Sequence, residues 1–501
     1  MRLFPIAISA ALLLAVPFSA PLSAQPAAAP APQTVDEALA LAPAGTRFGL
    51  LVVDDQGREI IAIRADDRFI PASNTKLFTT ATAFALLADK VAAAKLGTDA
   101  FGRYAPGAFI GLAERDDGPP HVILYGRGDA QMSSAADCKR DCLAELADFV
   151  ARKTRRVGDI VGDDSWFPDQ RWSPGMSWNN IGTDSGTAIS ALSLDNNEVP
   201  VVIAPGAEGQ PPIVEIAPYY TVRNEAVTIA AGGTTRLGFD RAINGTDLRI
   251  YGEIAVGAPP FRDRLGIDDP AHYTAWQLRR MLEVRGVKVD GAVRAQHRLV
   301  SLIDDPKVRE GRDVRVPMPR AAFMGGHTAP PLADTIRIVN KDSQNLYAEL
   351  LLRRVGKLEG TGSLADGIVG LHSVMAAAGV ARGWYDFSDG SGMSTYNRIS
   401  PRAAVTLLRW AKAQPWGRDW DASLPVGGVD GTLARRFRGT ALEGKIRAKT
   451  GTLNATNTLS GYLVAASGRE LTFSILANDV PDDGRAVPAM DAALGLIAAT
   501  N

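Results

Sequence analysis

The sequence predicts an α/β (α+β) fold in which two α/β segments flank a long and mostly β insertion. Near the N-terminus, two strand-like runs precede an Ala-, Leu- and Thr-rich helix, and near the C-terminus strand-like runs precede a final helix. Residues 98–317 instead combine many Gly, Pro and Asp turn signals with short strand-like runs. Neither flanking piece carries a complete sheet with helices on both faces, so we expect residues 34–97 and 318–501 to form one domain that is split in the sequence.

Composition excludes several classes of protein before any motif is considered. A length of 501 residues suggests about three domains, at roughly 150 residues per domain. Lysine and arginine total 54 and aspartate and glutamate total 55, so a net charge of −1 provides no general attraction to nucleic acid or to anionic membranes. Two cysteines and five dispersed histidines provide neither a disulfide scaffold nor a local metal motif, and we expect no metal or other cofactor.

Residues 1–24 are typical of a secretory signal peptide, with one positive charge, an apolar run and small residues before a cleavage site after Ala20 or Ala24. An uncleaved membrane anchor is the alternative, but the apolar stretch 3–16 is shorter than the roughly 20 residues that a span requires. Residues 25–33 form a Pro/Ala-rich linker. We therefore expect an exported protein of the periplasm or cell envelope, with no integral membrane span after cleavage.

The first expected elements after the linker are strands at 46–53 and 58–64, which the turn DDQG joins into a hairpin. A helix is expected next, because Pro71 and Ser73 provide helix-start chemistry ahead of a segment with few charges. A helix that is apolar on nearly all sides should be buried.

The central region is expected to be mostly β, with strands in HVILYGRG, VPVVIAP, AVTIAAG and DLRIYGEIAVG, and helices near 139–153 and 271–286. Cys138 and Cys142 lie in this region, in the turn CKRDC. If the protein is exported to an oxidising compartment, these two cysteines can form one small-loop disulfide. The alternative is a pair of free, partly buried thiols.

The C-terminal part is expected to return to an α/β pattern after a turn-rich segment near 318–331. Helices are expected at 333–340 and 346–356, strands near 444–450, 458–466 and 470–478, and an amphipathic helix at about 484–499.

The first motif with chemical meaning is Ser73-Asn74-Thr75-Lys76 at the start of the buried helix. Residues three apart lie on the same helical face, and the first turn exposes unpaired N–H groups. Burial would lower the pKa of Lys76, and a neutral lysine can remove the hydroxyl proton of Ser73. The alternative interpretation is a helix cap followed by a solvated lysine.

The second motif, Ser343-Gln344-Asn345, falls between two expected helices. On a loop, its hydroxyl and carboxamide can point into one cleft, where Ser343 would pass a proton to a leaving amine and Asn345 would align Lys76 with a substrate amide. A polar turn that links the two helices is the alternative.

The third motif, Lys449-Thr450-Gly451-Thr452, ends a strand-like run. On an edge strand, Lys449 and Thr450 can bind a carboxylate, and Gly451 allows a close approach to the backbone. The N–H of Thr452 can join that of Ser73 in an oxyanion hole. The alternative is a strand that ends in a glycine turn.

The three motifs occur together in the order found in active-site serine β-lactamases and penicillin-binding proteins. The chain resembles the D-alanyl-D-alanine carboxypeptidase/D-Ala-D-Ala endopeptidase family, the class C low-molecular-weight penicillin-binding proteins. The matching segments are PASNTKLFTTATA, LYGRGDAQ, VGDDSWF, ALSLDNNEV, NKDSQNLYAELLLRR, DFSDGSGMSTYNRISPR and IRAKTGTL. The resemblance implies a penicillin-recognising domain like that of serine β-lactamases, with an antiparallel sheet and helices, interrupted by an insertion whose outer subdomain lies near 195–260.

The resemblance also implies a role for each motif residue. Ser73 would be the acylated nucleophile and Lys76 its general base, and Ser343 and Asn345 would assist proton transfer and alignment. The terminal carboxylate of the peptide or drug would be held by Lys449 and Thr450, with Gly451 and Thr452 completing the site.

Three further features of the resemblance concern the walls of the cleft. The turn 389–392 resembles the family's cleft-lining loop, and we interpret it as structural because Gly390 and Gly392 permit a tight backbone. The resemblance also suggests Asp163 and Arg398 as counterparts of residues that contact diaminopimelate in some members of the family.

The expected function is a serine DD-peptidase that hydrolyses the terminal D-Ala-D-Ala bond of peptidoglycan stem peptides and D-Ala–diaminopimelate cross-links. Its partners would be peptidoglycan peptides and, as inhibitors, β-lactam antibiotics. A β-lactamase or esterase is one alternative, but Glu349, Glu359 and Glu443 lack the asparagine that would follow the deacylating glutamate of a class A enzyme. A non-catalytic peptidoglycan-binding module is another, although such a module would be expected to lose one of the motif residues.

Overall fold

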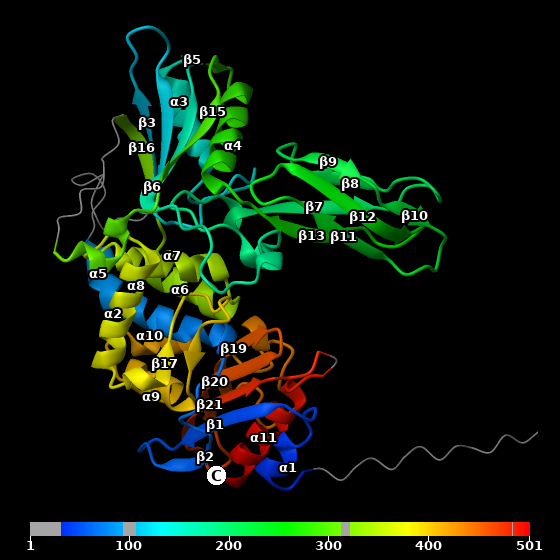
Figure 1. Cartoon of the computed structure of the whole chain (residues 1–501), viewed down its shortest axis with the longest axis vertical. Coiled ribbons are helices and arrows are strands. Elements are labelled where there is room, and N and C mark those ends of the chain that lie inside the picture. Colours follow the sequence, from blue (N-terminus) through cyan, green and yellow to red (C-terminus); the bar gives the residue numbers. More distant parts are fainter. Residues whose placement is uncertain (1–31, 94–106, 312–320, 483) are drawn as a thin grey trace, which may run out of the picture.

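The structure, a computed structural model of the chain, describes residues 32–93, 107–311, 321–482 and 484–501. The expected signal peptide, nearly all of the linker and both expected domain boundaries, at 97/98 and 317/318, lie outside these ranges. Figure 1 shows an antiparallel sheet at one end, a layer of helices beside it, a second sheet beyond the helices and a β-rich arm that extends to one side.

The first sheet joins strands from both ends of the chain. Its order is β19-β20-β21-β1-β2, and every neighbouring pair is antiparallel. The strands are β1 (Arg47–Val53), β2 (Glu59–Ile63), β19 (Ile446–Leu453), β20 (Thr456–Val464) and β21 (Glu470–Asn478). This pairing supports our proposal that the N-terminal and C-terminal segments form one domain.

Alternate residues of β1 face two different cores, as the pleat of a strand requires. Leu50 packs with α1 (Val35–Leu39) and α11 (Val487–Thr500), whereas Leu51 packs with a helix on the opposite face. The sheet therefore lies between two helical layers.

The helical layer is built around α2 (Thr75–Ala93), which follows the short helix η1 (Ala72–Asn74). Every residue of α2 from Thr75 to Phe84 is buried, as expected for a helix that is apolar on nearly all sides. The helices around it are α6 (Leu332–Lys341), α7 (Asn345–Gly356), α8 (Leu364–Ala377), α9 (Pro401–Lys412) and α10 (Gly417–Ala422). Helices α8, α9 and α10 were not among the expected elements, although Ser363 and Ser400 are N-cap residues that signal the first two.

The second sheet has the order β15-β6-β4-β3-β16 and mixes parallel and antiparallel pairs. Its strands are β3 (Gly107–Ala113), β4 (His121–Gly126), β6 (Ile160–Pro168), β15 (Val293–Arg298) and β16 (Ala322–Thr328), with α3 (Leu143–Lys153) and α4 (Pro270–Val284) packed against it. The boundary at 318 therefore precedes a strand that pairs with the inserted sheet. Sequence alone interpreted that strand as a turn-rich segment, because its pairing partner β3 is distant in the chain.

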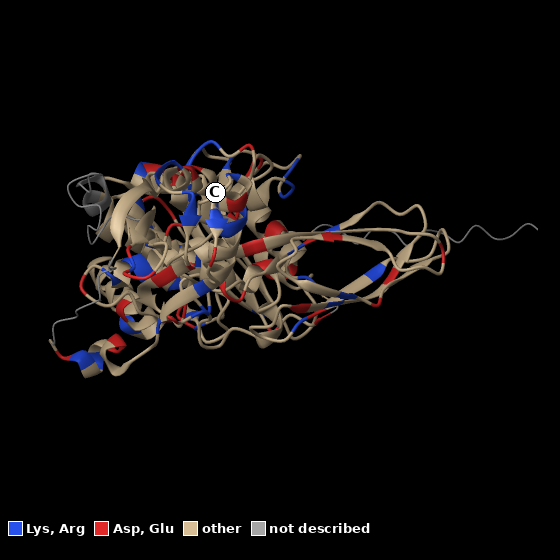
Figure 2. Ribbon diagram, turned by 90° about the horizontal axis from the view of Figure 1, so that it is seen from above, with Lys and Arg blue, Asp and Glu red and all other residues tan. Residues whose placement is uncertain are grey.

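The arm at the side of Figure 1 contains two small sheets that share a core with the second sheet. The first has the order β13-β7-β8, and the second is formed around β12. The strands are β7 (Glu198–Ala204), β8 (Ile213–Ile216), β9 (Thr221–Asn224), β10 (Val227–Ile229), β11 (Arg236–Asp240), β12 (Asp247–Ala255) and β13 (Phe261–Gly266). Acidic and basic residues are interspersed over the described ribbon, in keeping with the balanced charge (Figure 2).

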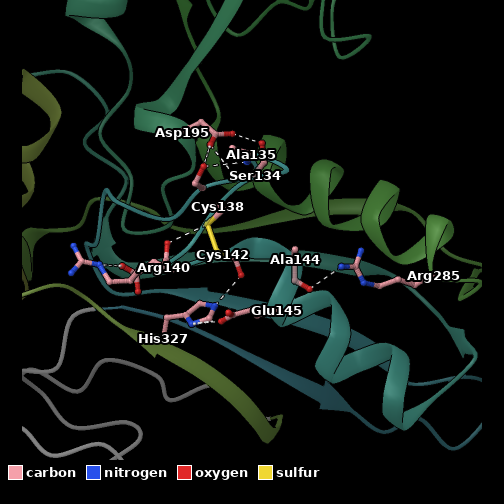
Figure 3. The surroundings of a disulfide bond; sticks show 12 residues. Ser134, Ala135, Cys138, Arg140, Cys142, Ala144, Glu145, Asp195, Arg285 and His327 are labelled. Carbon is pink, nitrogen blue, oxygen red and sulfur yellow. Dashed lines mark hydrogen bonds and ion pairs between the residues drawn. A yellow bond between two sulfur atoms is a disulfide. The ribbon is translucent and has the colours of Figure 1, made fainter.

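Cys138 and Cys142 are joined by a disulfide with a Cα–Cα distance of 5.8 Å (Figure 3). The bond closes the short loop before α3. Close to the disulfide, the N–H of Ser134 donates a 2.8 Å hydrogen bond to Asp195 Oδ1, which connects this segment to the start of the arm (Figure 3). None of the helices that the structure describes is both long enough and apolar enough to cross a membrane.

Candidate active site

Ser73 lies in η1, directly before the first turn of α2. The backbone before it is strained, because Ala72 has a φ of 47° in the left-handed region. The buried side chain of Asn74 holds this turn to the sheet, donating hydrogen bonds to the Lys449 carbonyl at 3.0 Å and to Thr458 Oγ1 at 2.8 Å. The nucleophile candidate is therefore fixed at the junction of a helix N-terminus and the edge strand β19.

Lys76 is fully buried one turn further along α2, with its amine beside Ser73. Its Nζ lies 2.9 Å from Ser73 Oγ, 2.6 Å from Asn345 Oδ1 and 2.6 Å from the Ser391 carbonyl oxygen. Burial lowers the pKa of Lys76 to about 7, against the opposing effect of nearby Asp389 and Glu349. A neutral amine can donate to the amide and carbonyl oxygens while its lone pair faces the Ser73 hydroxyl.

Lys449 is the second buried lysine of the site, and it lies on β19. Its Nζ contacts Ser343 Oγ at 2.8 Å and the Thr450 carbonyl at 2.9 Å. Burial and the neighbouring Lys76 hold the pKa of Lys449 well below its usual value. Ser343 occupies the short connection between α6 and α7, with a left-handed φ of 60° that turns its hydroxyl towards β19.

Gly451 follows on the same strand, at a place where a side chain cannot fit. A Cβ atom there would lie 2.9 Å from the Ser73 nitrogen and 2.2 Å from Thr458 Oγ1. Thr452 is exposed, and Thr450 Oγ1 donates a 2.7 Å hydrogen bond to Thr432 Oγ1. The edge strand therefore runs against the nucleophile turn and presents hydroxyl groups beyond it.

Asn345 begins α7 and connects the site to the inserted region. While its Oδ1 contacts Lys76, its Nδ2 donates a 2.9 Å hydrogen bond to the Ser185 carbonyl, in the segment between β6 and β7. The next carbonyl, that of Gly186, accepts a 2.9 Å hydrogen bond from Trp172 Nε1. This segment cannot be identified from the sequence, because a contact made by a backbone carbonyl has no residue-type signature.

The turn 389–392 supports the site from behind, consistent with its structural interpretation. Asp389 accepts hydrogen bonds from the N–H groups of Gly392 at 2.9 Å and Ser394 at 2.6 Å. Gly392 has a φ of 90°, and a Cβ there would lie 1.9 Å from the Ala72 carbonyl oxygen. Glu349 of α7 accepts from the N–H groups of Gly390 and Ser391, which sequence analysis also missed.

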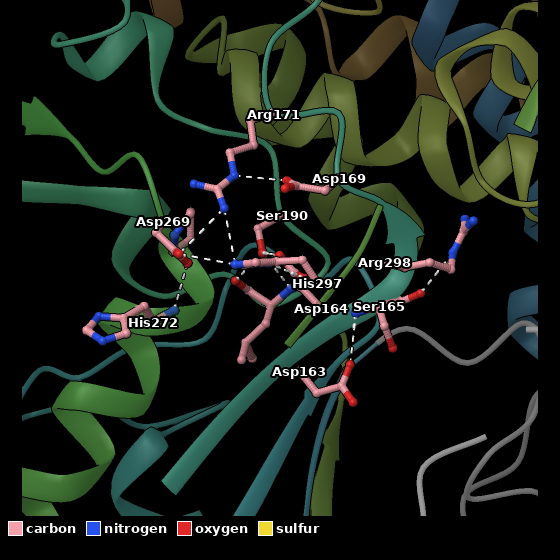
Figure 4. A network of polar contacts seen from close by, with 12 residues as sticks. Asp163, Asp164, Ser165, Asp169, Arg171, Ser190, Asp269, His272, His297 and Arg298 are labelled. Atoms are coloured by element: carbon pink, nitrogen blue, oxygen red, sulfur yellow. Dashed lines mark hydrogen bonds and ion pairs between the residues drawn. The ribbon is translucent and has the colours of Figure 1, made fainter. Parts of the chain in front are cut away.

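The side chains of Asp163 and Arg398 make their contacts outside the cluster formed by the three motifs. Asp163 is buried on β6 and accepts a 2.9 Å hydrogen bond from the Ser165 N–H (Figure 4). Arg398 donates to the carbonyls of Thr395 at 2.6 Å and Asn397 at 2.8 Å. Among the described residues, no hydrogen bond links either side chain to Ser73, Lys76 or Lys449.

A charged network lies where the second sheet meets α4 (Figure 4). His297 of β15 contacts Asp164 Oδ1 at 2.8 Å through Nδ1 and Asp269 Oδ2 at 3.1 Å through Nε2. These two hydrogen bonds raise the pKa of His297 to about 10. His297 and Asp269 border a cavity of about 820 Å³, which Arg171 also lines. Within the described ranges, no His, Cys, Asp and Glu side chains gather in threes or more in a way that could hold a metal ion.

Comparison with known proteins identifies the relatives of the chain. Residues 31–306 and 311–500 match the model of the D-Ala-D-Ala carboxypeptidase 3 (S13) family. The chain is 33% identical over 451 residues to a D-alanyl-D-alanine carboxypeptidase from Actinomadura sp. (strain R39), covering 87% of this chain and 78% of that protein. It is 24% identical over 446 residues to the D-alanyl-D-alanine carboxypeptidase DacB of Haemophilus influenzae, covering 86% and 85% of the two chains.

The fold is similar to that of a solved relative. The crystal structure of penicillin binding protein 4 from Haemophilus influenzae aligns with a TM-score of 0.74 at 20% sequence identity, covering 92% of this chain and 98% of that one.

Proposed function

Because the chain belongs to the D-Ala-D-Ala carboxypeptidase 3 (S13) family, we propose that it is an exported serine DD-peptidase that acts on peptidoglycan stem peptides. The reaction would hydrolyse the terminal D-Ala-D-Ala bond and the D-Ala–diaminopimelate cross-link through an acyl-enzyme on Ser73. The observation that carries the proposal is the 2.9 Å contact between Ser73 Oγ and the buried amine of Lys76.

In the acylation step, neutral Lys76 accepts the Ser73 hydroxyl proton while Oγ attacks the carbonyl carbon of the scissile bond. The carbonyl oxygen gains negative charge, which the N–H groups of Ser73 and Thr452 would bind. The close approach of Gly451 to the Ser73 nitrogen supports this arrangement, because it places the strand that carries Thr452 beside the nucleophile.

When the tetrahedral intermediate collapses, the C–N bond breaks and the leaving amine takes up a proton. Ser343 is proposed to relay to the amine the proton that Lys76 took from Ser73, so that Lys76 is neutral again and the Ser343 hydroxyl, bonded to Lys449, is unchanged. The substrate carboxylate would bind Lys449 and Thr450, and its charge would favour the protonated form of Lys449. Water then attacks the ester carbon while Lys76 accepts its proton, and Lys76 returns that proton to Ser73 Oγ as the C–O bond breaks and the product acid leaves.

Covalent labelling tests the nucleophile. A fluorescent penicillin is expected to label the purified wild-type protein and to leave Ser73→Ala unlabelled, because only the Ser73 hydroxyl can form the ester. Wild-type protein that resists labelling would contradict the proposal.

Product analysis distinguishes the proposed peptidase from the alternatives. Mass spectrometry of monomeric and cross-linked muropeptides should show loss of D-Ala and cleavage of dimers with the wild type and neither with Ser73→Ala. Rapid β-lactam turnover without D-Ala release would instead indicate a β-lactamase, and stoichiometric binding without any product would indicate a peptidoglycan-binding module.

Export is part of the proposal, with residues 1–24 as the signal peptide. The disulfide between Cys138 and Cys142 supports it, because disulfides persist in oxidising compartments. Fractionation of the producing cells, followed by N-terminal sequencing, should recover a mature chain that begins after Ala20 or Ala24.

A further inference from the structure

The proposed reaction leaves a buried carboxylate behind Lys76 without a role. Glu349 lies on α7, one turn after Asn345, and only 4% of its surface is exposed. Its Oε1 accepts hydrogen bonds of 2.9 Å from the N–H groups of both Gly390 and Ser391. The carbonyl of that same Ser391 accepts the 2.6 Å hydrogen bond from Lys76 Nζ. A short run of backbone therefore connects the Glu349 carboxylate to the amine of the proposed general base.

The backbone of this turn is closely confined, and Asp389 restrains it together with Glu349. A Cβ on Gly392 would lie 1.9 Å from the Ala72 carbonyl oxygen, and a Cβ on Gly390 would lie 3.0 Å from the Ala348 carbonyl oxygen. The turn is thus confined between the nucleophile turn on one side and α7 on the other. Two N–H groups of the turn point at one oxygen of Glu349, which fixes the peptide units before Ser391. The peptide unit that carries the Ser391 carbonyl follows directly, and its Gly392 N–H is held by Asp389 at 2.9 Å.

The charges around Lys76 come from three elements. Glu349 on α7 and Asp389 in the turn both favour the protonated form of Lys76. Lys449 on β19 acts in the opposite direction, because the two ammonium groups repel each other. Arg353, also on α7, faces Glu349. Neither Glu349 Oε2 nor Arg353 Nη1 has a hydrogen-bond partner among the described residues, so no direct hydrogen bond pairs these two atoms. Burial and Asp389 raise the pKa of Glu349.

We propose that Glu349 is a positioning residue that, together with Asp389, fixes the turn whose Ser391 carbonyl holds the Lys76 amine beside Ser73, and that its charge favours the protonated amine. The inference rests on the proposed function, since it assigns Lys76 as the general base. The Glu349 side chain thus makes two separate contributions. It positions the turn that carries the Ser391 carbonyl, and it places a negative charge near the Lys76 amine.

Two substitutions separate these contributions. Glu349→Gln keeps an oxygen acceptor at the same reach but removes the charge, whereas Glu349→Asp keeps the charge and withdraws the acceptor by one methylene. The control is Asp366→Asn, because Asp366 is also buried and also accepts a backbone N–H, that of Thr361 at 2.7 Å, but lies on α8 away from Lys76. The measurement is the second-order rate constant for acylation by a chromogenic β-lactam between pH 5 and 9, with thermal unfolding of each variant recorded in parallel.

The expected results differ between the variants. For Glu349→Gln, the midpoint of the acylation profile should move to lower pH by about one unit, because a nearby negative charge no longer stabilises the ammonium. For Glu349→Asp, the midpoint should stay and the plateau rate should fall at least tenfold, since a displacement of about 1 Å in a reacting group costs up to about a hundredfold. Asp366→Asn should lose stability while keeping both the midpoint and the plateau.

An unshifted midpoint in folded Glu349→Gln, or an unchanged plateau in Glu349→Asp, would overturn the inference. If Glu349→Gln does not fold, the plateau of Glu349→Asp decides the positioning role alone. Wild-type protein that is never acylated would refute the proposed function instead, so the two failures are distinguishable.

Discussion

At the scale of single residues, the site depends on two buried lysines that serve different partners. Lys76 faces Ser73 and two fixed oxygen acceptors, while Lys449 faces Ser343 at the edge strand. Both ammonium groups are disfavoured by burial, so each is prepared for a change of charge during the reaction. Lys76 is proposed to gain a proton from Ser73, and the substrate carboxylate would stabilise Lys449 as a cation.

The pKa of Lys76 leads to a prediction for the pH dependence of acylation. Its pKa of about 7 means that the amine is protonated below this pH and cannot accept the Ser73 proton. The acylation rate constant of the wild type should therefore rise from pH 5 to 8 with a midpoint near pH 7, and stopped-flow measurement with a chromogenic cephalosporin can follow it. A rate that is independent of pH over this range would exclude Lys76 as the general base.

A second prediction concerns the space at Gly451. Gly451→Ala would place a methyl group 2.9 Å from the Ser73 nitrogen, pushing the nucleophile turn away from β19. We expect acylation to slow by about a hundredfold, as displacements of about 1 Å in reacting groups do. The control is Gly495→Ala on α11, where a Cβ meets no atom within 4 Å and activity should be unchanged. Equal activities of the two variants would contradict the packing argument.

At the scale of elements, the site is assembled from α2, α7, β19 and the segment between β6 and β7. That last segment holds Asn345 through the Ser185 carbonyl, and Trp172 holds the adjacent Gly186 carbonyl. The inserted region therefore contributes to the proposed active site, because its segment between β6 and β7 accepts a hydrogen bond from the motif residue Asn345.

Trp172→Phe tests this contact, since it keeps an aromatic ring and removes the N–H donor. Loss of one hydrogen bond costs about 1 kcal/mol, so we expect acylation to slow by about fivefold at an unchanged pH midpoint. Trp276→Phe on α4 is the matched control, because Trp276 packs among Tyr219 and Tyr273 rather than near Asn345. If both variants acylate at the wild-type rate, the segment does not position Asn345.

Contacts between residues that are close in the sequence could be predicted, whereas contacts between distant segments could not. Ser73 and Lys76 could be paired from the sequence, because helical spacing places residues three apart on one face. The presence of Lys449 and Ser343 in one site was inferred only from the joint pattern of motifs, and their direct contact was not predicted. Ser185 and Glu349 could not be found, because their parts in the site are backbone contacts between distant segments, and strand β16 was missed for the same reason.

At the scale of the whole molecule, the inserted region is held together by buried charge as well as by its apolar core. His297 joins the second sheet to the start of α4 through Asp164 and Asp269. Its raised pKa, about 10, means that the folded protein binds a proton which the unfolded chain releases above its ordinary value of about 6.5. This stabilisation is complete below pH 6.5 and is lost as the pH rises through about 10.

His297→Gln should therefore destabilise the protein most at low pH. The difference in free energy of unfolding between wild type and variant is expected to be largest below pH 6.5 and to shrink steadily towards pH 10, which urea denaturation at several pH values can measure. A difference that does not change with pH would show that the histidine is neutral in the folded protein.

The pairing of β1 with β21 also has a consequence for how the chain acquires its structure. Residue Arg47 pairs with Asn478, so the central strands of the first sheet cannot meet until almost the whole chain is available. Such distant contacts slow folding, because a long loop must close before they form. The inserted sheets can form earlier, and during that interval β1 and β2 expose an unpaired edge. We therefore expect the newly synthesised chain to depend on chaperones, and C-terminal truncations that remove β21 to aggregate rather than to yield a smaller active enzyme.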